Sequence, residues 1–305
     1  MQKILITGGA GNIGSSLVAS LLQKKDVEVY VFDNFITGTQ ENLPIDNNRL
    51  FTFNCDINNN DELIENWGSN EFNYIFHYAA LVGVERTQNN PLGVLDDVKG
   101  IRNVLERAKE SQVKRIFYSS SSEVYGEPVE IPQNEDTTPL NSRVPYAVVK
   151  NLGEAFFRSY FKEYGIPFTI FRFFNTYGPN QNNDFVITKF IEQCMKGQKI
   201  TIYGDGSQSR SFLHIDDNIA FTNIVLEKDL FINEVVNVGS DDVISIKNLA
   251  LLIKDITESD SELVFLPPLK DGDMYRRKPD VTKMRLHMNT LTPLDKGITK
   301  TIDAS

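Results

Sequence analysis

A tyrosine, a lysine and a serine in the middle of the chain have the types and spacing for proton and hydride chemistry. Tyr146 and Lys150 are four residues apart at the start of a predicted helix, so they lie on one helical face. A tyrosine acts as general acid and base only when its pKa, ordinarily about 10, is lowered. An ammonium about 4 Å away supplies ~4 kcal/mol, which is what a shift of about three units requires. Ser121, just past a predicted strand, can hold the substrate oxygen, so the three residues predict hydride transfer to or from an alcohol carbon.

The chain opens with an apolar strand that turns into a helix through a loop with few side chains. The loop has glycines at Gly8, Gly11 and Gly14. Such a turn lets the backbone approach a pyrophosphate closely and aims the helix N-terminus at the negative charge. Asp33 ends the next apolar run, where a carboxylate can accept hydrogen bonds from ribose hydroxyls and repel a 2′-phosphate. Together these residues predict NAD, rather than NADP, as the cofactor.

Strand-like and helix-like segments alternate through the first half of the chain, which predicts an α/β fold. Strands are expected at 27–33, 50–54, 74–78, 115–119 and 168–173, and helices at 15–24, 60–67, 93–111 and 145–164. Continuous apolar strands indicate a Rossmann-type, doubly wound parallel sheet with helices on both faces. We expect an NAD-binding Rossmann domain at 1–175 and a smaller C-terminal α/β substrate-binding lobe at 176–305. A return segment near 212–240 should rejoin the sheet.

Several polar or small residues follow predicted strands. Asp33, Asp56, Ala79 and Ala80 stand at such positions, as do the serines that begin at Ser119. In a parallel α/β sheet, ligands bind outside the carboxyl ends of the strands. We therefore expect these residues to share one crevice.

The composition excludes several classes of function. With 41% hydrophobic and 24% charged residues, the 305-residue chain is typical of a globular protein. A formal net charge of −10 argues against nucleic-acid binding, which needs clustered Lys and Arg. Cys55 and Cys194 form no cluster, the three histidines have no ligand spacing, and no apolar run approaches the ~20 residues of a membrane span. We expect a cytoplasmic enzyme with reduced thiols, no metal site and no membrane partner.

Taken together, the motifs resemble the extended short-chain dehydrogenase/reductase family, and within it the NAD-dependent nucleotide-sugar epimerases and dehydratases. The likeness covers nearly the whole chain. It is carried by residues 7–14, 33–38, 55–57, 77–80, 119–126, 145–150, 172–179, 203–206, 210–212 and 216–217.

This resemblance implies a role for each matching residue. Tyr146 would be the acid–base group, Lys150 would hold the nicotinamide ribose, and Ser121 would orient the sugar hydroxyl. The cofactor would lie against Gly8, Gly11, Asn12, Ile13, Gly14, Asp33, Asn34, Asp56, Ile57, Ala79, Ala80, Tyr146 and Lys150. The nucleotide-sugar substrate would contact Val82, Ser122, Asn175, Arg210 and Arg277. Asp97 departs from the family pattern, which has asparagine at that place.

Glu123 discriminates most between the reactions of the family. All begin with oxidation at C4 to a 4-keto sugar, and a 4-epimerase needs no further group. A 4,6-dehydratase or a uronic-acid decarboxylase needs an added acid–base residue. The segments around Glu123 and Arg277 look like those of decarboxylases, whereas residues 79–84 and the stretch around Tyr146 look like those of epimerases.

The leading hypothesis is reversible 4-epimerisation of a nucleotide diphosphate sugar, a UDP-sugar, through a transient 4-keto intermediate. The alternative is a nucleotide-sugar lyase, either a UDP-glucuronate decarboxylase or a 4,6-dehydratase, with Glu123 as the added acid–base group and Arg277 holding a carboxylate. A hypothesis of another class is a non-catalytic NAD-binding regulatory protein, which would be expected to lack Tyr146 or Lys150. The resemblance also implies a homodimer formed through the helices near 93–111 and 145–164.

Overall fold

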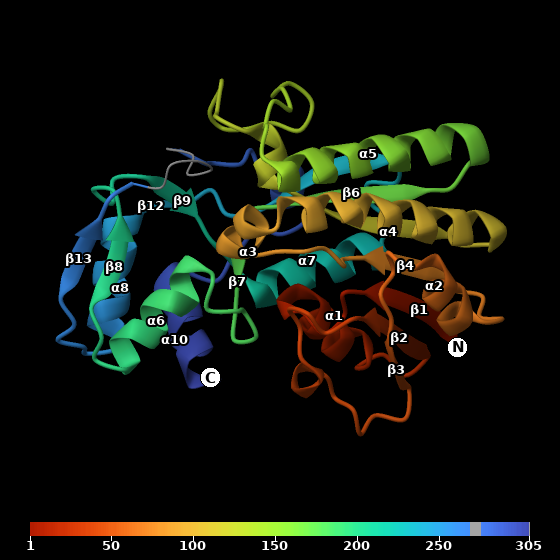
Figure 1. Ribbon diagram of the computed structural model, residues 1–305, viewed down its shortest axis with the longest axis horizontal. Coiled ribbons are helices and arrows are strands. Elements are labelled where there is room, and N and C mark those ends of the chain that lie inside the picture. The colour runs from red at the N-terminus through yellow and green to blue at the C-terminus, as the bar shows by residue number, and fades with distance from the viewer. Residues whose placement is uncertain (269–275, 305) are drawn as a thin grey trace.

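A seven-stranded parallel sheet forms the centre of the computed structural model, which describes residues 1–268 and 276–304 (Figure 1). Its strand order is β11-β6-β5-β4-β1-β2-β3. The strands are β1 (Gln2–Thr7), β2 (Val27–Asp33), β3 (Leu50–Asn54), β4 (Tyr74–His77), β5 (Arg115–Ser121), β6 (Phe168–Phe173) and β11 (Glu234–Val238). The chain runs outward from β1 in one direction and from β4 in the other. Ligands bind at such a reversal in α/β sheets.

Helices cover both faces of the sheet. Figure 1 shows α4 (Pro91–Glu110) and α5 (Pro145–Tyr164) side by side, and α2 (Asn60–Trp67) packs with α4. These three share one buried apolar cluster with the strands, because their inward positions carry side chains such as Leu63, Val104 and Phe157. A second cluster contains α1 (Asn12–Leu21), α7 (Ile215–Glu227) and α9 (Thr282–Arg285). Short helix α3 (Val84–Asn89) precedes α4.

A smaller lobe lies at one end of the sheet (Figure 1). It consists of α6 (Val186–Met195), β8 (Ile200–Tyr203), β9 (Ser209–Ser211), β12 (Val243–Ser245), α8 (Ile246–Ile256), β13 (Leu263–Leu266) and α10 (Leu294–Asp303). β13 pairs with β8 and β12 with β9, and the helices enclose a third apolar cluster. The two-residue strands β7 (Thr176–Tyr177) and β10 (Leu213–His214) pair between the sheet and this lobe.

The predicted fold class is confirmed, and most differences lie at the ends of elements. Besides these, α9 packs beside β11, outside the expected return segment near 212–240. α1 begins at Asn12 rather than at residue 15, directly after the glycine turn. β5 continues to Ser121, so this serine ends the strand instead of following it. The strand is longer than expected because its serines pair with β6 as far as Phe173. Across the described residues, we find no helix with the length and apolar character needed to cross a bilayer.

Candidate active site

One cavity of about 720 Å³ lies at the carboxyl ends of the central strands. The glycine turn, the ends of β2 and β4, the serines of β5 and the start of α5 line it, and α6 closes it from the lobe. Every site residue predicted from the sequence lines this cavity except Arg210. The expectation of a shared crevice at the strand ends is therefore met by the geometry.

The glycine turn forms a tight cradle at the N-terminus of α1. Gly8 has φ +70°, and a Cβ there would lie 2.6 Å from the backbone of Ala79. A Cβ at Gly14 would lie 2.2 Å from the Gly8 carbonyl oxygen. The turn therefore tolerates no side chain at these two positions, and its backbone and the start of α1 face the cavity directly. This arrangement suits a pyrophosphate.

Asp33 ties β2 to the glycine turn. Its two carboxylate oxygens accept hydrogen bonds from the Ala10 and Phe35 amides, each at 2.8 Å. Each oxygen keeps a further lone pair, and the residue lines the cavity. A carboxylate held in this way can accept hydrogen bonds from a ribose diol. Asp56 and Ile57 line the cavity after β3, on the side where the sequence predicts the adenine of NAD.

Tyr146, Lys150 and two serines of β5 come together in the cavity. The buried Lys150 Nζ donates to Ser119 Oγ at 3.3 Å and lies 5.7 Å from the centre of the Tyr146 ring. Tyr146 is hydrogen-bonded to Ser121. The spacing Tyr-x-x-x-Lys therefore places both side chains beside the end of β5, as the helical-face argument predicts.

The expected lowering of the Tyr146 pKa is wrong for the protein's own groups. Burial raises the pKa of Tyr146, and the carboxylates of Glu123 and Asp97 act in the same direction. The Ser121 hydrogen bond and the Arg277 charge oppose this without overcoming it. Burial also lowers the pKa of Lys150 to about 8. Residue spacing alone carries no information on desolvation, which is the largest contribution to both shifts.

Asp97 is a residue of this site to which the sequence assigned no role. It lines the cavity, and its Oδ2 accepts a hydrogen bond from the Leu81 amide at 2.7 Å. Burial raises the pKa of Asp97, while Lys150 opposes that rise. In turn, Asp97 raises the pKa of Lys150 against its burial. The departure from asparagine was the signal that pointed to this carboxylate.

Glu123 and Arg277 form an ion pair in the same cavity. Arg277 Nη2 lies 2.9 Å from Glu123 Oε1, and Nη1 donates to Ser122 Oγ at 3.2 Å. The Arg277 side chain is 5% exposed and that of Glu123 is 24% exposed. Ser121 Oγ caps the short 3-10 turn η2 (Ser122–Tyr125) by accepting from the Glu123 amide, which fixes the start of that turn. Residues 154 positions apart are thus brought together.

Asn175 and Arg210 are placed differently from these residues. Asn175 lines the cavity with φ +35°, and its Nδ2 donates to the Ser211 carbonyl at 2.8 Å. Arg210 is buried on β9, opposite Ile244 of β12, outside the cavity lining of the described chain. Their contacts with a diphosphate or a nucleotide stay predictions.

Comparison with known proteins agrees with this site. Residues 4–239 match the family model described as "NAD dependent epimerase/dehydratase family". The chain belongs to this family. It is therefore an NAD-dependent enzyme of nucleotide-sugar metabolism, and the cradle, Asp33 and the cavity described above fit that cofactor.

Individual relatives carry three different activities. UDP-glucuronic acid decarboxylase 1 of Danio rerio is 34% identical over 99% of this chain and 72% of its own length. The UDP-glucose 4-epimerase of Thermotoga maritima, solved with UDP-glucose, has a TM-score of 0.92 at 30% identity and covers 99% of this chain and 98% of its own. DesIV, a dTDP-glucose 4,6-dehydratase of Streptomyces venezuelae solved with NAD, has a TM-score of 0.91 at 28% identity and covers 99% and 96%. These relatives agree on the family but catalyse different reactions. Which reaction this chain catalyses must therefore be argued from its own residues.

Proposed function

We propose that this protein converts a UDP-sugar through a 4-keto intermediate and that its reaction is decarboxylation of a uronic-acid sugar. The single observation that supports this choice is the Glu123–Arg277 pair in the cavity that also holds Tyr146. A guanidinium 5% exposed to solvent is suited to bind a carboxylate in bidentate fashion. A neutral hexose offers it no such group. The Glu123–Arg277 pair therefore supports the lyase, which is the alternative hypothesis from the sequence, over the 4-epimerase.

Each proton transfer of the proposed reaction can be assigned to a side chain of the cavity. Lys150 and the residues of the glycine turn would hold NAD, which when bound would supply the acceptor for the C4 hydride and the donor that later returns it. Tyr146, as phenolate, would accept the proton of the C4 hydroxyl. Its hydrogen bond to Ser121 favours the phenolate, and the positive nicotinamide ring of bound NAD would supply the lowering of the pKa that the protein's own groups do not. The product is a β-keto acid, so the C5–C6 bond breaks, CO₂ leaves, and the electron pair moves toward the C4 oxygen. Once the substrate carboxylate replaces Glu123 on Arg277, the partly exposed Glu123 would take up a proton from solvent and transfer it to C5. Tyr146 would return its proton to the C4 oxygen as the hydride comes back to C4.

A second candidate is the reversible 4-epimerisation that the sequence ranked first. It is favoured by a specific contact, because Arg277 is already paired with Glu123 and Ser122. A neutral sugar leaves that ion pair intact, whereas a carboxylate must compete with Glu123 for the guanidinium. Epimerisation needs only Tyr146, Lys150 and Ser121 for its chemistry.

Product analysis separates these reactions. The purified protein is incubated with UDP-glucuronate, UDP-glucose, UDP-GlcNAc and dTDP-glucose, and the products are followed by NMR. We expect CO₂ and a UDP-pentose from UDP-glucuronate. Interconversion of UDP-glucose and UDP-galactose without CO₂ release would establish the epimerase. A stable 4-keto-6-deoxy sugar would establish the dehydratase, and no turnover of any substrate would favour the regulatory protein.

A matched pair of arginine variants tests the proposed role of the ion pair. Arg277→Gln removes the guanidinium from the cavity, and turnover of UDP-glucuronate should fall 10²-fold to 10³-fold, about 3–4 kcal/mol. Arg276→Gln removes the same charge from the exposed neighbouring residue outside the cavity lining and should stay within about twofold of the parent. Equal losses in both variants would contradict carboxylate binding by Arg277.

The predicted homodimer stays a proposal. α4 and α5 contact each other and carry apolar side chains on their outer face, including Leu95, Val148 and Leu152, each more than 40% exposed. Such a face is suited to pair with a second copy of itself. Light scattering coupled to size-exclusion chromatography would measure the mass. The cytoplasmic location likewise stays a prediction.

A further inference from the structure

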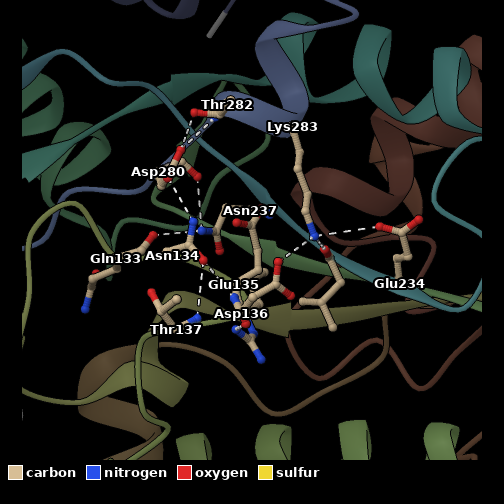
Figure 2. Close-up of polar contacts among 12 residues, drawn as sticks. Gln133, Asn134, Glu135, Asp136, Thr137, Glu234, Asn237, Asp280, Thr282 and Lys283 are labelled. Atoms are coloured by element: carbon tan, nitrogen blue, oxygen red, sulfur yellow. Dashed lines mark hydrogen bonds and ion pairs between the residues drawn. The ribbon is translucent and has the colours of Figure 1, made fainter.

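Arg277 reaches the cavity from a segment that lies outside the large sheet. Residues 276–280 run beside the loop at 133–137, and a short parallel bridge joins Gln133 to Pro279. The Gln133 amide donates to the Lys278 carbonyl, and the Asp280 amide donates to the Gln133 carbonyl, both at 2.8 Å. The backbone next to Arg277 is therefore held against the 133–137 loop. Figure 2 shows Asp280 beside Gln133 and Asn134 of this loop.

A side-chain contact locks the same two segments together. Asn134 Nδ2 donates to Asp280 Oδ2 at 2.9 Å (Figure 2). The other oxygen of Asp280 accepts from the Thr282 amide at 2.9 Å, and Asn134 Oδ1 accepts from the Asp136 amide at 2.9 Å. Asn134 and Asp280 thus each use one side-chain atom to bond a backbone amide of their own segment. The other atom of each makes the hydrogen bond between the two segments. The crossing contact has a defined direction, with an amide donor on one side and a carboxylate acceptor on the other.

Asn237 connects this contact to the Glu123 side of the cavity. It is fully buried on β11, and its Nδ2 donates to the carbonyls of Gln133 at 2.9 Å and Asp280 at 3.1 Å. Its Oδ1 accepts from the Tyr125 hydroxyl at 2.7 Å. Tyr125 ends the 3-10 turn that contains Glu123. One side chain therefore touches both the segment that carries Arg277 and the turn that carries Glu123.

The Tyr125 hydroxyl is fixed in turn by a buried ion pair within the sheet. Arg172 Nη1 donates to this hydroxyl at 2.9 Å, and Arg172 Nη2 lies 2.8 Å from Glu154 Oε2. Both charged side chains are 2% exposed. Ser120 of β5 donates to Glu154 at 2.6 Å. The network thus runs without a gap from the central strands to residue 280, and each buried member is costly to remove because its partner is left unpaired.

We propose that Asn134, Asn237 and Asp280, which we call the polar clasp, are positioning residues that set the distance between Glu123 and Arg277. The clasp makes no contact with the cavity itself, since none of its members lines it. Its effect is on the backbone next to Arg277, and so on how well the guanidinium is presented to a substrate carboxylate. The part of the inference that concerns a carboxylate rests on the proposed decarboxylase function.

A reciprocal exchange across the crossing contact tests the clasp. Asn134→Asp places a carboxylate oxygen opposite Asp280, and Asp280→Asn places an amide nitrogen opposite the Nδ2 of Asn134. Each single variant loses the crossing hydrogen bond but keeps the atom that orders its own segment. The double variant Asn134→Asp/Asp280→Asn restores an amide and a carboxylate with donor and acceptor reversed. The single variants change the net charge in opposite directions, so a pure charge effect would have opposite signs in the two.

Hydrogen exchange of the complete protein gives a readout that is independent of the reaction. Peptides within 276–282 and 121–126 should exchange about tenfold faster in both single variants and return to the parental rate in the double variant, because a tenfold change corresponds to about 1.4 kcal/mol of local opening. Parental exchange in both single variants, or no recovery in the double variant, would overturn the inference. The milder Asp280→Asn keeps its Thr282 contacts, so it carries the test if Asn134→Asp fails to fold.

Kinetics then test the link to the substrate. In the single variants, KM for UDP-glucuronate should rise about tenfold with a smaller change in kcat, and the double variant should recover it, while NAD affinity stays within about twofold throughout. A purely structural role would lower stability and move KM and NAD affinity together, which would overturn the positioning role. If the parent releases no CO₂, the proposed function is wrong, and hydrogen exchange still decides whether the clasp holds residues 276–282.

Discussion

The two edges of the cavity are built in opposite ways. At the cofactor edge, Gly8, Gly14 and Asp33 belong to one strand-turn-helix-strand unit, and two of the three act by having no side chain. At the other edge, Glu123 and Arg277 come from segments 154 residues apart and are held by buried hydrogen bonds. The first edge is specified by local backbone geometry and the second by tertiary polar contacts. A family can therefore keep its cofactor site constant while residues at the second edge change the reaction.

Tyr146→Phe should have the largest effect on turnover, and it should leave the structure of both edges of the cavity unchanged. Removing the hydroxyl eliminates the acid–base group, so turnover should fall between 10²-fold and 10⁴-fold. NAD affinity, measured by titration calorimetry, should change little because the ring remains. Tyr164→Phe, at the exposed end of the same helix, is the control and should keep parental turnover. Parental activity in the Tyr146 variant would refute its assigned role.

A pair of glycine variants should break the cofactor edge selectively. A Cβ at Gly14 would lie 2.2 Å from the Gly8 carbonyl oxygen, whereas one at Gly11 would lie at an ordinary 3.6 Å from the same atom. Gly14→Ala should therefore lower the free energy of unfolding by about 3 kcal/mol, and Gly11→Ala should change it by less than about 1 kcal/mol. Urea denaturation measures both. Equal stability of the two variants would contradict the tight cradle.

The smallest effect is expected from mild acidification, through a buried histidine at the end of β4. His77 ends β4, and burial, with Lys150 adding to it, lowers the pKa of His77 to about 3. Between about pH 6.5 and 3 the unfolded chain binds a proton that the folded chain does not. The folded state therefore loses ~1.4 kcal/mol for each pH unit below 6.5.

His77→Gln keeps a group able to meet Thr7 Oγ1, which lies 2.9 Å from His77 Nδ1, but removes this titration. Urea denaturation at pH 7, 6 and 5 should show a shallower loss of stability than in the parent. His287→Gln, at a partly exposed histidine, is the control and should follow the parental slope. A parental slope in the His77 variant would mean that the buried ring is not the source of acid sensitivity.

The sequence predicted the cofactor edge better than the other edge for a physical reason. The glycine spacing, Asp33 and the Tyr146–Lys150 face depend on neighbours within a few residues or on the period of one helix, so they can be read from the chain. The positions of the strands along the chain followed from their apolar runs. In contrast, the partners of Arg277 depend on how residues 133–137 and 276–280 come together, which no local pattern encodes. The sign of the Tyr146 pKa shift was missed because desolvation depends on the whole fold.

The route of the chain between the sheet and the lobe has a consequence for modular engineering. After β7 the chain enters the lobe, returns as α7 and β11, leaves again for β12 and α8, comes back as α9 beside β11, and ends in the lobe as α10. β11, which forms when the chain first returns from the lobe, is the strand that pairs with the outer side of β6. No single cut releases either half as a self-sufficient fragment, and grafting a foreign lobe would require several simultaneous splice points. Altered substrate preference in this scaffold is therefore reached more readily by point substitutions along the returning strands and their flanking turns than by exchange of whole modules.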